Sequence, residues 1–312
     1  MHRRFYSLVA ATLLGFAALP VSAQNYQIPV ETLTRRANAA LALLAYSVVP
    51  DLTSSFLSVS KSGGDQNDIY MTQFAGGGTM STNIPVYLEG GVGYMRYDPN
   101  FVASNGTDTR PIPAKWNNLG LTGGIGWDFP VAENLVFRPI FNVSVGEVAS
   151  DLSVASRYLA WKTGAAINFL NGGQMNAYGV GGSAMLDYEV RRPDHDIDIE
   201  WRYTDIRLQS FAGSSIQGSA DAQTTSLYAR WRAPTGLTAF DGPLRYVLEG
   251  AHTTYFGDQR GLLGFNYLSS IGAGVEFDTS AHDMYITRTR LVFRLSFGDN
   301  VRGAALGLAV SF

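Results

Sequence analysis

The chain contains no cysteine, which excludes disulfide-stapled domains and any site that needs a thiolate as metal ligand or nucleophile. It also has few charges: Asp, Glu, Lys and Arg make up 16% of its residues, against about 25% in average soluble proteins. Its 23 basic residues do not outnumber its 26 acidic ones, so the sequence predicts no nucleic-acid partner. Beyond residue 23 no run of 18 apolar residues occurs, and no membrane-crossing helix is expected there.

The first residues have the three parts of an export signal. A basic start at residues 2–4 precedes a short apolar run, Leu8 to Leu19, and the small residues Val21-Ser22-Ala23 form a cleavage site. This pattern predicts a signal peptide over residues 1–23, removed after Ala23. A retained anchor helix is the alternative, but the apolar run is short for one.

Residues 24–50 are predicted to form a linker that contains an amphipathic helix. Leu33, Ala37, Ala40, Leu41, Leu44 and Val48 recur at helical spacing. Pro29 and Glu31 suit the start of a helix over residues 29–48, and Pro50 suits its end. The apolar stripe favours burial, either inside the structure that follows or against its rim.

From about Tyr70 to the end, large apolar residues alternate with small or polar ones in segments separated by turn residues. The alternating apolar positions of successive segments include Val86 to Tyr94, Leu119 to Phe129, Leu135 to Val145, Leu159 to Phe169, Tyr178 to Val190, Ile197 to Tyr203, Leu227 to Trp231, Tyr246 to Leu248, Ile271 to Phe277 and Leu291 to Phe297. Repetition of this pattern predicts an antiparallel transmembrane β-barrel of about 12 strands over residues 51–312. Residues 54–60 are a further candidate strand, which would require two other segments to merge. A soluble β-sandwich is the alternative, although its strands are usually shorter than these segments.

The opposite parity of these segments carries the charges. A charge in the lipid-facing row costs about 2–4 kcal/mol at the membrane midplane, so the charged row is predicted to face a wet or internally paired lumen. The predicted lumen-lining residues are Asp196, Asp198, Glu200, Arg230, Arg232, Arg288, Arg290 and Arg294.

The last ten residues, GAALGLAVSF, form an alternating strand that ends on Phe312. Such an ending resembles the last strand of bacterial outer-membrane barrels, where it helps the assembly machinery recognise the chain. The resemblance predicts Phe312 as an assembly signal. The expected partners are outer-membrane lipid and, during biogenesis, the barrel assembly machinery and periplasmic chaperones.

Several segments resemble one family. They are VVPDLTSSFLSVS (Val48 to Ser60), MTQFAGGGT (Met71 to Thr79), PVYLEGGVGYMRYDPNFVAS (Pro85 to Ser104), GGIGWDFP (Gly123 to Pro130) and RPIFNVSVG (Arg138 to Gly146). The chain is similar here to the solitary outer-membrane autotransporter-type β-barrels. That resemblance implies a barrel in the outer membrane of a Gram-negative cell that stands without a passenger domain, and it implies no reaction.

The sequence offers few groups for catalysis. His252 is the best candidate base for a hydrolase, but alternation places it in the lipid-facing row, and its sequence neighbours are Thr253 and Thr254. Asp194, His195 and Asp196 cluster at one turn, where one short segment supplies too few ligands for a metal. We therefore predict no enzyme, no metal and no cofactor.

The favoured functional hypothesis is a non-enzymatic outer-membrane barrel with a structural role, or with a narrow pore if the helix is displaced. A surface-interaction role through the connections at 99–115 or 257–266 is a further possibility. The alternative is a barrel-embedded hydrolase that acts on lipid or peptide through His252 or the cluster at residues 194–196.

Overall fold

The computed structural model describes residues 38–46, 56–61, 69–81, 83–97, 100–104, 109–113, 115–151, 174–211, 217–239, 242–262, 265–278, 288–299 and 301–311. Within these residues it shows a helix over residues 38–46 and fifteen β-strands. Among these described residues no helix is long and apolar enough to cross a membrane.

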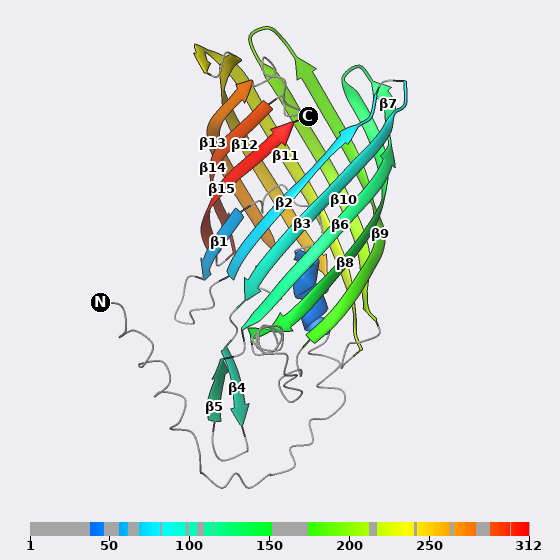
Figure 1. Ribbon diagram of the computed structural model, residues 1–312, viewed down its shortest axis with the longest axis vertical. Helices are drawn as coiled ribbons and strands as arrows, with labels where there is room; N and C mark the ends of the chain where they lie inside the picture. The colour runs from blue at the N-terminus through cyan, green and yellow to red at the C-terminus, as the bar shows by residue number, and fades with distance from the viewer. Residues whose placement is uncertain are drawn as a thin grey trace, which may run out of the picture.

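The strands follow one another as antiparallel neighbours (Figure 1). Their bounds are β1 Phe56–Lys61, β2 Ile69–Thr79, β3 Val86–Tyr97, β4 Asn100–Ser104, β5 Thr109–Pro113, β6 Trp116–Trp127, β7 Phe129–Ala132, β8 Leu135–Ser150, β9 Gln174–Arg191, β10 Asp196–Ser210, β11 Ser219–Ala239, β12 Gly242–Gly257, β13 Tyr267–Asp278, β14 Arg288–Gly298 and β15 Val301–Ser311. β4 and β5 form a separate hairpin, which lies beyond one end of the main sheet.

The main sheet closes into a barrel. It runs β6-β3-β2-β1-β15-β14-β13-β12-β11-β10-β9-β8-β7, and the additional pairing of β6 with β8 joins its two ends. β7 follows β6 after a single residue, Asp128, and both strands pair with β8. β6 and β7 therefore occupy one position in the ring, so the 13 strands of the main sheet make a barrel of 12 positions. The predicted barrel of about 12 strands is confirmed.

Two of the predicted strand segments need comment. The segment at 159–169 lies outside the described residues, and β8 and β9, which flank it in the sequence, pair directly with each other. The alternative strand at residues 54–60 is present instead: β1 pairs with β15 on one side and β2 on the other and so closes the ring.

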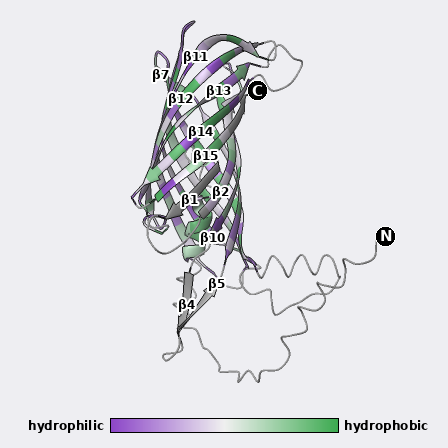
Figure 2. Ribbon diagram, turned by 90° about the vertical axis from the view of Figure 1, so that its left-hand side faces the viewer, coloured by the Kyte–Doolittle hydropathy of each residue, from purple (hydrophilic) through white to green (hydrophobic). Residues whose placement is uncertain are grey.

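The outer face of the barrel wall is apolar, and buried polar side chains line much of its inner face. Large side chains such as Leu88, Val92, Leu121, Ile125, Phe141, Val143, Leu248, Ile271, Phe293 and Leu306 are exposed on the outer face. Residues of the opposite parity on the same strands are buried, as with Asn142 between Phe141 and Val143. Figure 2 shows polar and apolar residues alternating along the strands. This inside-out polarity is that of a transmembrane barrel.

The two ends of the barrel differ in their connections. At the end where β15 finishes lie the tight turns 133–134, 192–195 and 240–241, and we call this the short-turn end. At the other end, the long-loop end, strands are joined by 98–115 and 151–173. The helix lies inside the barrel in its long-loop half (Figure 1). The predicted N-terminal amphipathic helix is therefore present over residues 38–46; its predicted ends, 29–37 and 47–48, lie outside the described residues, as does Phe312.

Candidate functional site: the barrel lumen

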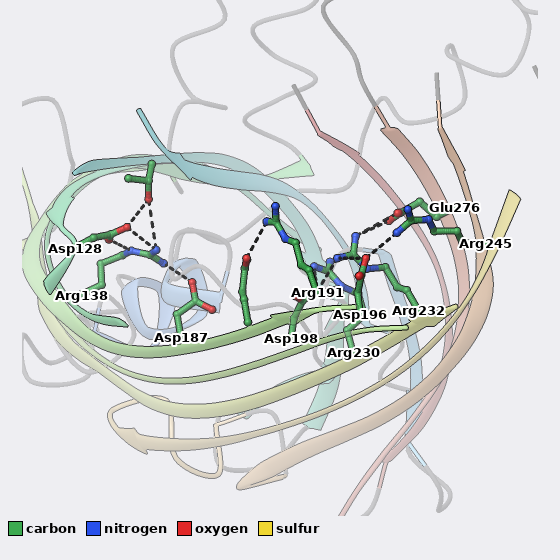
Figure 3. Close-up of polar contacts among 12 residues, drawn as sticks. Asp128, Arg138, Asp187, Arg191, Asp196, Asp198, Arg230, Arg232, Arg245 and Glu276 are labelled. Atoms are coloured by element: carbon green, nitrogen blue, oxygen red, sulfur yellow. Dashed lines mark hydrogen bonds and ion pairs between the residues drawn. The ribbon is translucent and has the colours of Figure 1, made fainter. Parts of the chain in front are cut away.

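The lumen has two halves of opposite character. Buried charged side chains fill the part toward the short-turn end, where they meet in ion pairs (Figure 3). Buried apolar side chains and the helix fill the part toward the long-loop end. Each half is described in turn.

The best-satisfied group of the charged half spans one third of the ring, from β3 to β10. The guanidinium of Arg202 binds Glu89 through two hydrogen bonds of 2.7 Å each, one to each carboxylate oxygen. Arg202 also donates to Ser183 and to Thr204, at 2.8 and 3.0 Å. Asn142 donates to Glu89 at 2.6 Å and accepts from the Ser183 hydroxyl at 2.7 Å. Every member of this group, the Glu89–Arg202 cluster, therefore has several partners, as a charge withheld from water requires.

A second group, the Arg138 cluster, lies nearer the short-turn end. Arg138 on β8 binds Asp128, which joins β6 to β7, and Asp187 on β9 at 3.1 Å. Thr79 donates to the same Asp128 at 2.6 Å. The Arg138 guanidinium also lies 4.0 Å from the ring centre of Tyr87 on β3, close enough for a cation–π contact. One arginine thus ties five consecutive wall segments together.

The third group follows β10 to β14, and we call it the arginine row. Arg230 binds Asp198, while Arg232 lies 3.3 Å from both Asp196 and Asp198. The remaining contacts of the row are Arg232 with Glu276 at 3.2 Å, Arg245 with Asp196 at 2.7 Å, Arg294 with Glu249, and Tyr228 with Glu249 at 2.9 Å. Three of these pairs, Arg232–Glu276, Arg245–Asp196 and Arg294–Glu249, join strands that are not neighbours, so these side chains reach over the strand that lies between them.

The apolar half receives the helix. Leu41 and Leu44 are both 0% exposed and belong to one cluster with Ile206 and Leu208 of β10. On the other side of the helix, Tyr46 packs with Tyr255, at 4.9 Å between ring centres. Wall residues that complete the two clusters are Val148, Met175, Ala177, Ala220, Ala222, Met71, Met95, Phe265, Leu268 and Val301.

Polar contacts fix the helix at the long-loop mouth. The backbone N–H of Ser219, the first residue of β11, donates to the Asn38 side chain at 3.0 Å. The Tyr46 hydroxyl donates to the carbonyl of Gln259, in the connection between β12 and β13, at 2.8 Å. Both partners lie at the long-loop end, so the helix is held in this mouth of the barrel.

Inward-facing glycines make room for this filling. A Cβ on Gly146 would lie 2.7 Å from Leu44 of the helix. A Cβ on Gly307 of β15 would lie 2.4 Å from the Arg294 guanidinium, and one on Gly272 would meet Arg294 and Glu249 at 3.0 and 3.1 Å. At these positions a larger residue would collide with the helix or with the arginine row. The inner face of β15 carries small side chains there, and Arg294 of the neighbouring strand β14 fills the space beside Gly307.

The structure places the predicted lumen-lining residues as follows. Asp196, Asp198, Arg232 and Arg294 are buried, and Arg230 is half-buried, all within the arginine row. Glu200 lies half-buried on the inner row of β10, opposite Asp187 of β9 in the strand register. Arg288 and Arg290 are half-buried at the start of β14.

Sequence reasoning missed two partners of these residues, Glu249 and Glu276. It also missed charged members of the other two groups: Glu89, Arg138, Asp128 and Asp187. Alternation could have placed Glu89 in the lumen, because it has the opposite parity to the outward-facing Leu88 and Val92 on its strand. The apolar half was missed too. The inner row of β10 changes at Ile206 and Leu208 from charged to apolar, which marks where the helix packs.

The turn at residues 192–195 does not form the cluster considered from the sequence. Asp196 turns inward to Arg245, whereas Asp194 stays exposed and contacts His195 at 3.1 Å. The hydrogen bond from His195 holds the pKa of the Asp194 carboxyl below its ordinary value. Among the described residues no group of three or more His, Cys, Asp or Glu could hold a metal ion.

Comparison with known proteins gives matches among solved structures only. No protein-family model matches the sequence, and no curated protein matches it. The β domain of the Bordetella autotransporter BrkA is similar over 82% of this chain and 96% of its own, at 14% identity and a TM-score of 0.48. The transport unit of AIDA-I from Escherichia coli is similar over 92% and 100%, at 14% identity and 0.43. The translocator domain of NalP from Neisseria meningitidis is similar over 82% and 86%, at 11% identity and 0.40. The chain is thus similar to autotransporter β domains, the kind of barrel that the sequence resembles, while the fold itself is assigned from its own strand pairings.

Proposed function

We propose that the chain is an outer-membrane barrel whose lumen is sealed by its own N-terminal helix and by the lumen ion pairs. It then serves as a closed membrane anchor, and its long-loop end faces the cell surface. The observation that carries the proposal is the helix at residues 38–46, which lies in the mouth of the ring with its residues 40–46 buried. No enzymatic step is assigned to the lumen.

The outer wall supports the membrane location. Its apolar band is bordered by aromatic side chains, which favour the interface between lipid and water. Toward the long-loop end, Tyr94 and Tyr178 donate to Asn117 and Gln209, each at 2.7 Å. Toward the short-turn end, Trp231 lies on Tyr246, with ring centres 5.1 Å apart.

The unequal connections support the orientation, because outer-membrane barrels have short periplasmic turns and longer extracellular loops. The chain has no native cysteine, so single cysteines report on orientation directly. We expect Gln217→Cys, exposed at the long-loop end, to react with a membrane-impermeant maleimide on intact cells. Arg192→Cys, exposed at the short-turn end, should react only after the outer membrane is permeabilised. The reverse pattern would contradict the proposed orientation.

The helix and the Glu89–Arg202 cluster block the lumen one after the other, and this arrangement predicts which variants conduct ions. In planar bilayers the full mature chain should show no steady conductance, because both the helix and the Glu89–Arg202 cluster close the lumen. Removal of residues 24–50 should leave the cluster as the remaining barrier. The same deletion combined with Arg202→Ala should open a steady conductance. Steady conductance from the full chain would exclude a closed anchor and would favour the narrow pore lined by the arginine row.

The partners expected from the sequence remain part of this proposal. The exposed apolar band requires outer-membrane lipid around it, and the chain would reach that membrane with the help of periplasmic chaperones and the barrel assembly machinery. Phe312 is proposed as the assembly signal. The absence of a passenger domain is likewise a proposal.

A further inference from the structure

A polar cluster interrupts the apolar outer wall between β12 and β13. His252 and Ser269 are opposite each other in the strand register, and the His252 Nδ1 lies 2.8 Å from the Ser269 hydroxyl. Both point outward, in rows that also contain Leu248 and Ile271. In the strand register Leu227 of β11 faces His252, and Phe297 of β14 faces Ser269, and both are exposed apolar residues. The pair therefore lies within the lipid-facing surface.

The imidazole of His252 is held on its other side as well. Its Nε2 lies 3.1 Å from the hydroxyl of Thr254, and its ring stacks on Tyr267 with ring centres 5.6 Å apart. If the Ser269 hydroxyl donates to Nδ1, then Nε2 carries the proton and donates to Thr254. This tautomer leaves the lone pair of Nδ1 directed at the Ser269 proton, as a general base requires.

We propose that Ser269 and His252 form a nucleophile–base pair that cleaves carboxylic esters of lipids in the outer leaflet. A serine within hydrogen-bond reach of a histidine that a third group orients is the arrangement of an activated nucleophile. The pair lies where the apolar wall gives way to the polar end residues Thr254 and Gln223, the depth at which lipid ester bonds separate chains from head groups. The assignment of the pair to the outer leaflet rests on the orientation given under the proposed function; the pairing of Ser269 with His252 does not.

The chemistry balances with water as the only co-reactant. The Ser269 Oγ attacks the ester carbonyl, and its proton passes to Nδ1 of His252. The bond to the alcohol oxygen breaks, and that oxygen takes the proton from Nδ1. Water then attacks the acyl-serine, its proton passes to Nδ1, and the proton returns to Ser269 as the fatty acid leaves. Thr254 accepts the Nε2–H bond throughout and keeps the ring in place.

The contacts of the pair also indicate how fast ester hydrolysis should be. Within the described part of the chain, both side-chain hydrogen-bond partners of His252 are hydroxyls and neither is a carboxylate. An oxyanion donor is typically worth about 100- to 1000-fold in kcat, and the β-strand amides around Ser269 are engaged in the ladder. We therefore expect slow turnover, best detected through the acyl-serine.

The first experiment labels the detergent-solubilised full mature chain with a fluorophosphonate probe. We expect one modification, located at Ser269 by mass spectrometry and absent in Ser269→Ala. His252→Ala should slow labelling by about 100-fold, the contribution of a general base. The matched control is Thr225→Ala, because Thr225 lies in the neighbouring outer row opposite Thr254 and its hydroxyl reaches the Arg202 carbonyl instead of His252. Gel mobility with and without heating shows that each variant is folded.

The second experiment separates the possible sources of the ester. The folded barrel is placed in vesicles of glycerophospholipid, or in vesicles that also contain lipid A, and released fatty acid is measured. Release that is lost in Ser269→Ala supports the proposal, and the vesicle that shows it identifies the substrate. The proposal is overturned if Ser269 in the folded barrel takes up no probe, or if neither lipid loses fatty acid. Labelling in detergent does not depend on orientation or on a closed lumen, so its failure is distinguishable from failure of the proposed function.

Discussion

Replacing Glu89 with alanine should lower the free energy of unfolding by about 3–5 kcal/mol, the cost of leaving one member of a buried ion pair alone. The Arg202 guanidinium would lose both of its hydrogen bonds to the carboxylate while its side chain stays almost wholly out of water. Asn142 would lose its acceptor at the same time. Urea unfolding of the refolded barrel in detergent, followed by tryptophan fluorescence, measures the change.

A surface pair supplies the control for this prediction. Arg207 and Asp221 lie 3.8 Å apart at the long-loop end of β10 and β11, beyond the apolar band, with more than half of both side chains exposed. Exposed pairs of this kind contribute about 0–1 kcal/mol, so Arg207→Ala should change the free energy of unfolding by no more than that. The double variant Glu89→Leu with Arg202→Met should recover part of the loss, because no unpaired charge then remains. Equal effects of Glu89→Ala and Arg207→Ala would show that the lumen at Glu89 is wet.

The outer wall was predictable because alternation and membrane energetics act locally. Leu88, Val92 and Tyr94 share one parity because every second residue of a strand faces the same side. The cost of charge in lipid then assigns that side to the membrane. The same rule gives no place in the ring to the alternating residues 159–169, which lie outside the described residues, because β8 and β9 pair directly with each other.

The filling of the lumen could not be read from the sequence because it depends on distant partners. Glu89 and Arg202 are 113 residues apart and meet only because four strand pairings curve the sheet between them. The parity of each residue indicates that it faces inward, but not which charge it meets across the ring. The Ser269–His252 contact is similar: the register between β12 and β13 creates it, and the sequence around His252 shows only threonines.

The position of the helix is the clearest case of tertiary context deciding between alternatives. The apolar stripe of residues 29–48 required burial, and both the lumen and the periplasmic rim could supply it. Small inward-facing residues of the wall make room for the helix in the lumen. Gly146 leaves space for Leu44, and Ala177, Ala220 and Ala222 pack against the helix with short side chains. A helix nine residues long would be marginal in water, so its stability comes from this packing.

Leu44→Asp should therefore release the helix from the mouth of the barrel. The substitution removes a fully buried leucine, which costs about 2–5 kcal/mol, and leaves a carboxylate among Ile206, Leu208 and the other apolar wall residues. A cysteine at Ala45, which is also fully buried, reports the release. With Leu44 in place, Ala45→Cys should react with maleimide slowly. With Leu44→Asp its rate should rise by at least about 100-fold, as a loss of roughly 3 kcal/mol in helix docking implies.

Asn38→Asp provides the matched control, because it adds the same charge to the same helix at its first described turn. There the carboxylate still accepts the Ser219 N–H bond, so the contact at the long-loop mouth is kept. Ala45→Cys should stay protected in that variant, which separates loss of packing from gain of charge. If Leu44→Asp leaves Ala45→Cys unreactive in a folded barrel, then the helix stays docked without the packing of Leu44, and the contact with Ile206 and Leu208 is not what holds it in the lumen. If it reacts and the barrel still does not conduct, the two seals act independently, and the charged half remains closed after the apolar half has opened.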